Sequence, residues 1–155
     1  MKPSVYIETT IPSYLVARPS RDVVLAGHQQ ITHEWWQNSR PNHELFISDY
    51  VIKEVSRGDS VMAQQRLSVI QGIPLLPNSI ETEDLARDLI SRLNLPDQAK
   101  TDAFHIAIAA VHGIDFLLTW NCTHINNMHM QRRIEIACRE AGYSPPVIGT
   151  PEELI

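Results

Sequence analysis

The chain has 155 residues, of which 43% are hydrophobic and 20% are charged, and it carries a formal net charge of -5 at pH 7. This length suits one domain with a single core, and the composition excludes a disordered or fibrous protein. The acidic balance excludes binding to nucleic acid through phosphate neutralisation alone. It remains compatible with a nuclease whose carboxylates carry metal ions, because the bound cations reverse the local charge.

The cysteine pattern and the length of the apolar runs predict where in the cell the protein is found. Cys122 and Cys138 form no CxxC pair, and no secretory leader precedes Val5, so neither a disulfide framework nor a zinc site is expected. No apolar run approaches the roughly 20 residues that cross a bilayer. We therefore expect a soluble cytoplasmic protein with no membrane partner.

The first third of the chain predicts strands alternating with helices. Residues 4–7 are apolar and β-branched, which predicts a buried strand that ends in a polar loop beginning at Glu8. Residues 23–38 have the spacing of a helix with one broad apolar face. A second strand is predicted over 44–48, and Asp49 at its end can cap the next helix.

The middle of the chain continues this alternation. Residues 63–70 read as a helix, and residues 73–76 as a third short strand bounded by turn residues. An amphipathic helix is predicted over 82–93, and it closes near Pro96.

An Ala-rich helix and a buried strand form the most informative stretch. Apolar residues recur at helical spacing over 103–111, and residues 115–120 then read as a buried strand. Because this helix is apolar on most sides, we expect it to pack deep against a sheet, with Asp102 at its start near the core. A helix over 126–140 follows, and residues 146–148 can add a last edge strand.

The repeated strand-then-helix order predicts an α/β fold. We expect three layers, with helices on both faces of a central, mostly parallel sheet of four to five strands. No internal repeat, linker or low-complexity segment divides the chain, so residues 1–155 are expected to form one domain. In such sheets, functional groups gather at the carboxyl ends of the strands.

Four polar residues are predicted to meet at that edge of the sheet. Glu8 and Asn121 follow buried strands, Glu54 lies in the helix after the second strand, and Asp102 begins the Ala-rich helix. Mg²⁺ and Mn²⁺ prefer oxygen ligands, and a bound cation activates water for attack on a phosphate. These four residues are therefore the candidate catalytic group, with Glu8, Glu54 and Asp102 as metal ligands.

Each of the four also has a purely structural explanation. Glu8 can be a solvated carboxylate at a strand end, and Glu54 can belong to a surface ion pair. Asp102 can be a helix cap or a first-turn acid, and Asn121 can form a turn after a strand. Only the combination favours a functional site.

Thr9, His124 and Asn126 are candidates for contact with a substrate. Hydroxyl groups at a strand end can hold phosphate or orient ligands, and the other two residues lie in the polar segment after the last buried strand. His105 lies one turn after Asp102 and can face the site. No HxxxH or HExxH spacing is present, which disfavours zinc hydrolase chemistry.

The chain contains, in this order, the segments VYIETTIPSYL, SDYVIKEVSRGD, TDAFHIAIAAVHGIDFLLTWN and CTHINN. Together they resemble a PIN domain of the toxin type, the ribonuclease of VapBC toxin–antitoxin pairs, over nearly the whole chain. The resemblance implies a PIN-like fold and a Mg²⁺- or Mn²⁺-dependent endoribonuclease that hydrolyses RNA. It places Glu8, Glu54 and Asp102 at the acidic positions and Asn121 at the fourth. It also implies an antitoxin as protein partner and a homodimer.

Two positions depart from the pattern of that family. Glu8 stands where Asp is most frequent, which lengthens the side chain by a methylene, and Asn121 stands where Asp is often found, which removes a charge. One alternative is therefore a catalytically weak PIN scaffold that binds RNA or protein. A metal-dependent hydrolase of small phosphate esters is disfavoured, because the sequence has no Gly-rich phosphate loop or DxD motif.

Overall fold

A parallel sheet lies at the centre of the computed structural model, which describes residues 1–155. Its four strands are ordered β2-β1-β3-β4, and every neighbouring pair is parallel. They are β1 (Ser4–Ile7), β2 (Glu44–Phe46), β3 (Phe116–Leu118) and β4 (Val147–Gly149). The central strands are covered on both faces, which explains their continuous apolar runs.

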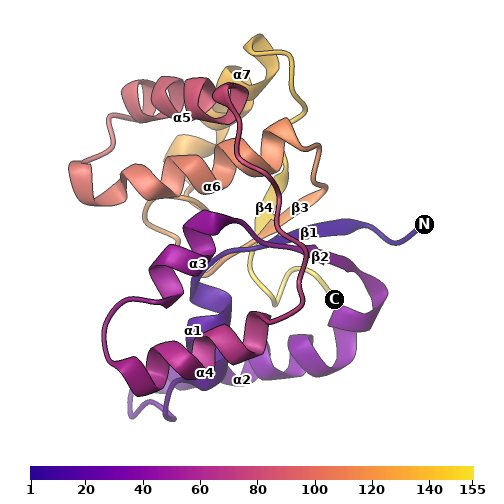
Figure 1. The fold of residues 1–155 in the computed structure, drawn as a ribbon, viewed down its shortest axis with the longest axis vertical. Helices are drawn as coiled ribbons and strands as arrows, with labels where there is room; N and C mark the ends of the chain where they lie inside the picture. The colour runs from indigo at the N-terminus through magenta and orange to yellow at the C-terminus, as the bar shows by residue number, and fades with distance from the viewer.

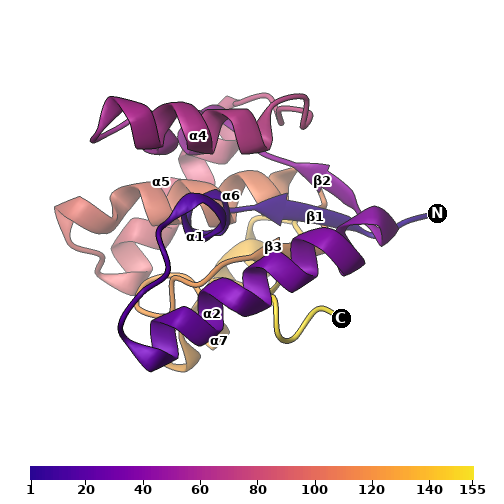
Figure 2. The same cartoon turned by 90° about the horizontal axis from the view of Figure 1, so that it is seen from below.

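Seven α-helices surround the sheet: α1 (Thr10–Val16), α2 (Val23–Glu34), α3 (Asp49–Val55), α4 (Ser60–Ile70), α5 (Ile80–Leu93), α6 (Lys100–Val111) and α7 (Met128–Glu140). Figure 1 shows α5, α6 and α7 on one side of the strands and α1, α2 and α4 on the other. Seen from below, α2 lies nearest the viewer and runs obliquely past the sheet (Figure 2). The predicted α/β fold with helices on both faces is confirmed.

The hydrophobic core is one contiguous cluster of 33 buried residues. Helix α6 contributes heavily to it, because six of its 12 residues, among them Ala103 and Ala107, belong to the cluster, and His105 is buried beside them. Its small side chains allow close packing, and its first turn brings Asp102 to the edge of the core. None of the helices is both long and apolar enough to span a membrane.

The strand predicted over 73–76 is wrong. This segment makes only an isolated bridge between Ile47 and Leu75. The Ile47 amide donates to the Pro74 carbonyl at 3.0 Å, and the Leu76 amide donates to the Ile47 carbonyl at 2.8 Å. The ladder cannot extend toward Ile73 because Pro74 has no amide hydrogen, and it ends on the other side because helix α3 begins at Asp49.

The polar loop predicted after the first strand is limited to Glu8 and Thr9, since helix α1 begins at Thr10. Pro12 is tolerated there because it lies in the first turn, where its missing amide hydrogen leaves no helical bond unmade. The helix predicted over 23–38 is α-helical to Glu34 and then widens into a π-helical turn. At α3, Ser48 takes the N-cap position, and Asp49 is the first helical residue, without a side-chain cap bond.

Candidate metal centre

Glu8 lies directly after β1, and its side chain is fixed by two threonines. Its Oε1 atom accepts hydrogen bonds from the Thr10 hydroxyl and the Thr119 hydroxyl, both at 2.6 Å, and from the Thr10 amide at 3.1 Å. Every fully buried polar side-chain atom has a hydrogen-bond partner, so the Oε2 atom, which has none, is reached from solvent. The carboxylate is thus held through one oxygen and offers the other.

Glu54 enters the site from α3 and is held in a similar way. Its Oε1 atom accepts a hydrogen bond from the Thr9 hydroxyl at 2.6 Å and bonds to His105 Nε2 at 2.5 Å. His105 is fully buried, and its Nδ1 atom bonds to the Tyr6 hydroxyl at 2.6 Å. Tyr6 in turn bonds to the Ser48 hydroxyl at 2.7 Å. A continuous hydrogen-bonded chain therefore runs from the core to Glu54.

The contact between Glu54 and His105 keeps the glutamate ionised. Burial disfavours the charged form of Glu54, but the hydrogen bond and the charge of His105 outweigh this and lower its pKa. Burial likewise opposes the imidazolium, but the bond to Glu54 and the charges of Glu8 and Glu54 raise the pKa of His105. Glu54 is therefore an anion at neutral pH, which is the form that binds a cation.

Asp102 lies in the first turn of α6 and faces the same edge of the sheet. Its Oδ2 atom is 3.5 Å from His124 Nδ1, and its side chain is only 13% exposed. Its pKa is raised from 3.8 to about 6, mainly by burial; the charge of His105 and a hydrogen bond from Asn121 lower it, and the charges of Glu8 and Glu54 add to the rise. This sensitivity to both glutamates indicates that the three carboxylates lie in one electrostatic cluster.

Asn121 closes the turn that follows β3. Its Oδ1 atom accepts from the backbone amides of Thr123 at 3.2 Å and His124 at 3.0 Å. Its carbonyl accepts from the Asn126 amide at 2.8 Å. The side-chain oxygen expected to assist the metal is thus engaged by its own turn.

The donor atoms of this cluster fit a hard divalent cation. One ligand atom each of Glu8, Glu54 and His105 lies within 4.8 Å of the others. Both ring nitrogens of His105 are already bonded, so the carboxylate oxygens are the donors that remain. Oxygen donors of this kind suit Mg²⁺ and Mn²⁺. Asp102 is not in this tightest group, although the structure brings it to the same cluster.

Sequence reasoning missed most of the groups that support the carboxylates. Tyr6 and Thr119 lie within or next to apolar runs, where they read as ordinary strand residues, whereas the hydroxyl of Thr10, at the strand end, is of the kind expected to orient a ligand. His105 offered a stronger signal, since it is an ionisable residue inside an Ala-rich, apolar helix. Its actual partner comes from α3, which no local pattern indicates.

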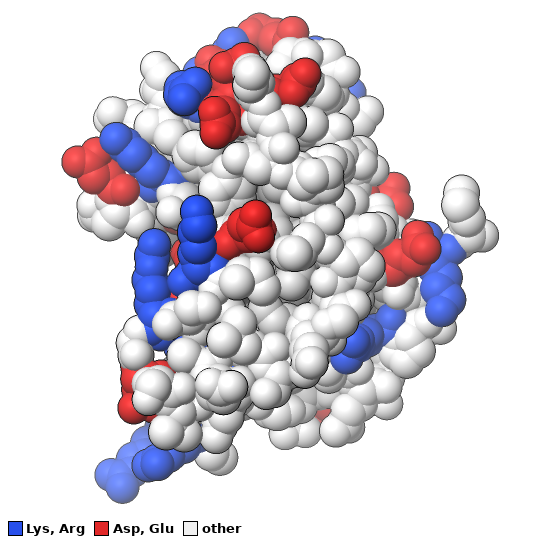
Figure 3. All heavy atoms as spheres, viewed as in Figure 1, with Lys and Arg blue, Asp and Glu red and all other residues white.

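Cationic side chains lie along the same edge of the molecule. Figure 3 shows Lys and Arg gathered at the left, over α3 and the start of α6, on the side toward which β1 runs in Figure 1. Lys53 on α3 and Arg57 in the bend that follows the helix stand on either side of Glu54 in the sequence, and both are exposed. Neither forms an ion pair, so both remain available to an anion.

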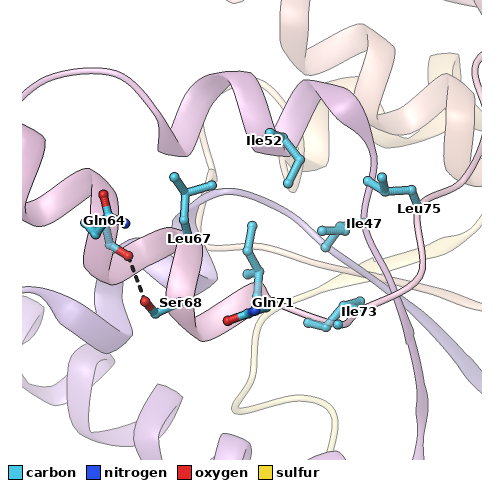
Figure 4. A pocket seen from close by; sticks show the side chains of 10 residues that line it. Ile47, Ile52, Gln64, Leu67, Ser68, Gln71, Ile73 and Leu75 are labelled. Atoms are coloured by element: carbon cyan, nitrogen blue, oxygen red, sulfur yellow. Dashed lines mark hydrogen bonds between the residues drawn. The ribbon is translucent and has the colours of Figure 1, made fainter.

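An apolar groove of about 420 Å³ lies between α3, α4 and the segment that follows α4 (Figure 4). Ile47, Ile52, Leu67, Ile73 and Leu75 line it together with polar side chains at its rim. None of the acidic cluster belongs to this lining, so the groove and the candidate metal centre are separate features.

Comparison with known proteins extends the result for the fold. No family model and no curated protein matches this sequence. A similar solved structure is the crystal structure of VapBC2 from Rickettsia felis bound to a DNA fragment from their promoter. One of its chains matches with a TM-score of 0.59 and 15% sequence identity, over 94% of this chain and 97% of that chain. At this identity the likeness shows the fold alone, and it agrees with the PIN-like α/β fold that the sequence predicts.

Proposed function

We propose that this chain is a Mg²⁺- or Mn²⁺-dependent endoribonuclease that hydrolyses RNA phosphodiester bonds in the cytoplasm. The observation that carries this proposal is the cluster of Glu8, Glu54 and Asp102 at the carboxyl ends of β1 and β3. Glu8 and Glu54 each use Oε1 for internal hydrogen bonds. Their second oxygens are free to bind a cation.

Each residue of the cluster has its own role in the proposed hydrolysis. Glu8 and Glu54 hold the metal, and His105 keeps Glu54 in place as a carboxylate. When bound, the divalent ion activates a water molecule and neutralises negative charge on the phosphate. Asp102 supplies a third carboxylate to the same cluster.

The candidate substrate contacts separate into two groups. The Thr9 hydroxyl donates to Glu54, which supports a role in positioning that carboxylate. His124 is 30% exposed beside Asp102, and Asn126 is half-buried in the same turn. We assign His124 and Asn126 to contacts with RNA.

A cleavage assay with matched aspartate variants tests the proposal. We expect wild-type protein to cut a mixed single-stranded RNA pool with Mn²⁺ and to stop cutting in EDTA. Asp102→Ala should lose cleavage by at least about tenfold, while Asp97→Ala should retain it, because Asp97 is 93% exposed in the 3₁₀ turn before α6. Equal cutting by wild type and Asp102→Ala, with both proteins folded by circular dichroism, would contradict the assignment.

A second candidate function is favoured by Asn121, whose side-chain oxygen is engaged by backbone amides. A site with one ligand fewer can leave a PIN-like scaffold that binds RNA or protein without cutting. Titration calorimetry separates the two functions. Absence of Mn²⁺ binding that depends on Glu8 and Asp102 would favour the binding module.

We further propose that the chain is the toxin of a toxin–antitoxin pair and forms a homodimer. The likeness to a chain of VapBC2 supports this partner class, as does the sequence resemblance to toxin-type PIN domains. Co-expression with the protein encoded beside it, followed by measurement of the mass of the purified complex, tests both assignments. A monomeric chain that copurifies with no second protein would contradict them.

A further inference from the structure

Three aromatic rings are stacked beside the acidic cluster. Trp120 lies parallel to Tyr14, with ring centroids 5.9 Å apart and planes 8° apart, and parallel to His28 at 4.1 Å and 14°. Trp120 is 7% exposed, and its indole N–H donates to the Thr32 hydroxyl at 2.8 Å. The Trp120 ring is therefore fixed, and it provides a rigid support for Tyr14.

Tyr14 is placed next to Glu8 by the geometry of α1. It lies one helical turn after Thr10, so both side chains are on the same face of the helix. The Thr10 hydroxyl donates to Glu8 at 2.6 Å and accepts from the Trp120 amide at 2.8 Å. Burial raises the pKa of the Tyr14 phenol, and the charges of Cys122 and Glu8 raise it further. The phenol is thus close to the acidic cluster.

Only part of the Tyr14 side chain is buried in the core. Its side chain is half-buried, and its hydroxyl has no hydrogen-bond partner, so that atom is reached from solvent because all fully buried polar atoms are bonded. Tyr6, in contrast, is fully buried with two partners for its hydroxyl. Tyr14 therefore combines a supported ring with an open edge at the rim of the site.

We infer that Tyr14 is a stacking platform for a nucleobase next to the scissile phosphate. The inference rests on the proposed ribonuclease function and deepens it by naming a side chain that contacts the substrate. Every base has a π-face that can stack on an aromatic ring, which accounts for recognition of single strands without sequence readout. A base inside a duplex is already covered on both faces by its neighbours and must first leave the stack.

Two exposed cations near Glu54 suit the phosphates of the same strand. Lys53 lies on α3 and Arg57 in the bend that follows it, and neither is neutralised by an acidic partner. Lys and Arg position a nucleic-acid backbone without reading its sequence. These two side chains are therefore available to hold phosphates of a strand whose base stacks on Tyr14.

A binding assay with a fluorescent base tests the role of Tyr14. A short single-stranded RNA containing 2-aminopurine is titrated with protein in Ca²⁺ instead of Mn²⁺, and recovery of intact RNA on a gel excludes cleavage. Stacking quenches the fluorescence, so we expect quenching by wild type and by Tyr14→Phe. Tyr14→Leu keeps apolar bulk against Trp120 but has no π-face, and its affinity should fall by about 5- to 100-fold.

The matched duplex is the second arm of the experiment. We expect it to bind wild type at least about tenfold more weakly than the single strand and to be insensitive to Tyr14→Leu. Equal affinity of Tyr14→Leu and wild type for the single strand, or equal affinity of wild type for the two RNA forms, would overturn the inference. Urea unfolding of Tyr14→Leu shows that a loss of affinity is not a loss of folding.

The outcomes also separate this inference from the proposed function. Mn²⁺-dependent cleavage together with binding that ignores the Tyr14 ring would overturn the stacking role alone. Ring-dependent binding without cleavage would overturn the nuclease and keep the stacking role.

Discussion

In Glu8 and in Glu54, one carboxylate oxygen accepts internal hydrogen bonds and the other is left free for a ligand. The Oε1 atoms of Glu8 and Glu54 accept all the internal hydrogen bonds of these side chains. Asp102 has less compensation, since burial and the neighbouring carboxylates raise its pKa from 3.8 to about 6. The folded protein without metal is therefore destabilised by ionised Asp102.

Asp102→Asn should stabilise the metal-free protein in a pH-dependent manner. Because the folded-state pKa lies above the unfolded value, the folded state binds more protons between about pH 4 and pH 6, and stability falls as the pH rises through that window. At about pH 8 in EDTA, the substitution should raise the free energy of unfolding by up to about 3 kcal/mol. At about pH 4 it should have little effect, since the native Asp102 is then protonated.

Urea unfolding at the two pH values measures this difference. Asp97→Asn is the matched control, because Asp97 is 93% exposed and its substitution should change stability little at either pH. An equal change in the free energy of unfolding for Asp102→Asn at both pH values would show that ionisation of Asp102 does not destabilise the folded state.

The sequence indicated the site's carboxylates better than their supports. Glu8 and Asp102 stand at the end of a strand and the start of a helix, and topology places such positions at one edge of the sheet. The bonds of His105 to Glu54 and to Tyr6 join segments that are 51 and 99 residues apart. Such pairings depend on tertiary packing, so no local spacing could predict them.

At the scale of elements, the segment between β3 and α7 determines how His124 is presented. Asn127 caps α7 by accepting from the His129 amide at 3.0 Å, and its Nδ2 atom donates to the Cys122 carbonyl at 3.0 Å. The same side chain thus starts the helix and fixes the turn before it. Neither contact involves the acidic cluster directly.

Asn127→Ala should lower the free energy of unfolding by about 1–2 kcal/mol, because the helix loses its N-cap. Asn127→Asp keeps the capping oxygen and loses only the bond to Cys122, so it should retain most of the stability. Urea unfolding of the three proteins measures both steps. Identical midpoints for Asn127→Ala and wild type would show that the cap contributes nothing.

Most helices and strands could be predicted from periodicity, and the failures occur where proline acts. In α1, Pro12 suggested a loop but occupies a first turn that needs no amide hydrogen. In the segment after α4, apolar residues suggested a strand, but Pro74 has no amide hydrogen to donate, and pairing is limited to the bridge at Leu75. Proline is thus informative only when its position relative to hydrogen-bonded amides is known.

At the scale of the whole molecule, the clustered carboxylates couple metal binding to stability. A ligand that binds only the folded state stabilises it by about 2.7 kcal/mol at a concentration a hundredfold above its Kd. Mn²⁺ at such a concentration should therefore raise the melting temperature by roughly 5–10 °C for a domain of this size. Glu8→Gln should abolish most of this shift.

Thermal melts with increasing Mn²⁺ measure the effect. Glu83→Gln on α5 is the matched control, because its side chain is 40% exposed and belongs to a surface ion pair away from the cluster. Equal shifts for Glu8→Gln and Glu83→Gln would show that Mn²⁺ binds elsewhere.

The hydrogen bond from Thr119 to Glu8 determines when the acidic cluster can be completed during synthesis of the chain. Thr119 lies 111 residues after Glu8, and a ribosome needs roughly 5–20 s to translate that interval. During this time the nascent chain exposes Glu8 without its partner and without the strand that completes the cluster. A cluster assembled in this order is complete only after most of the chain has left the ribosome.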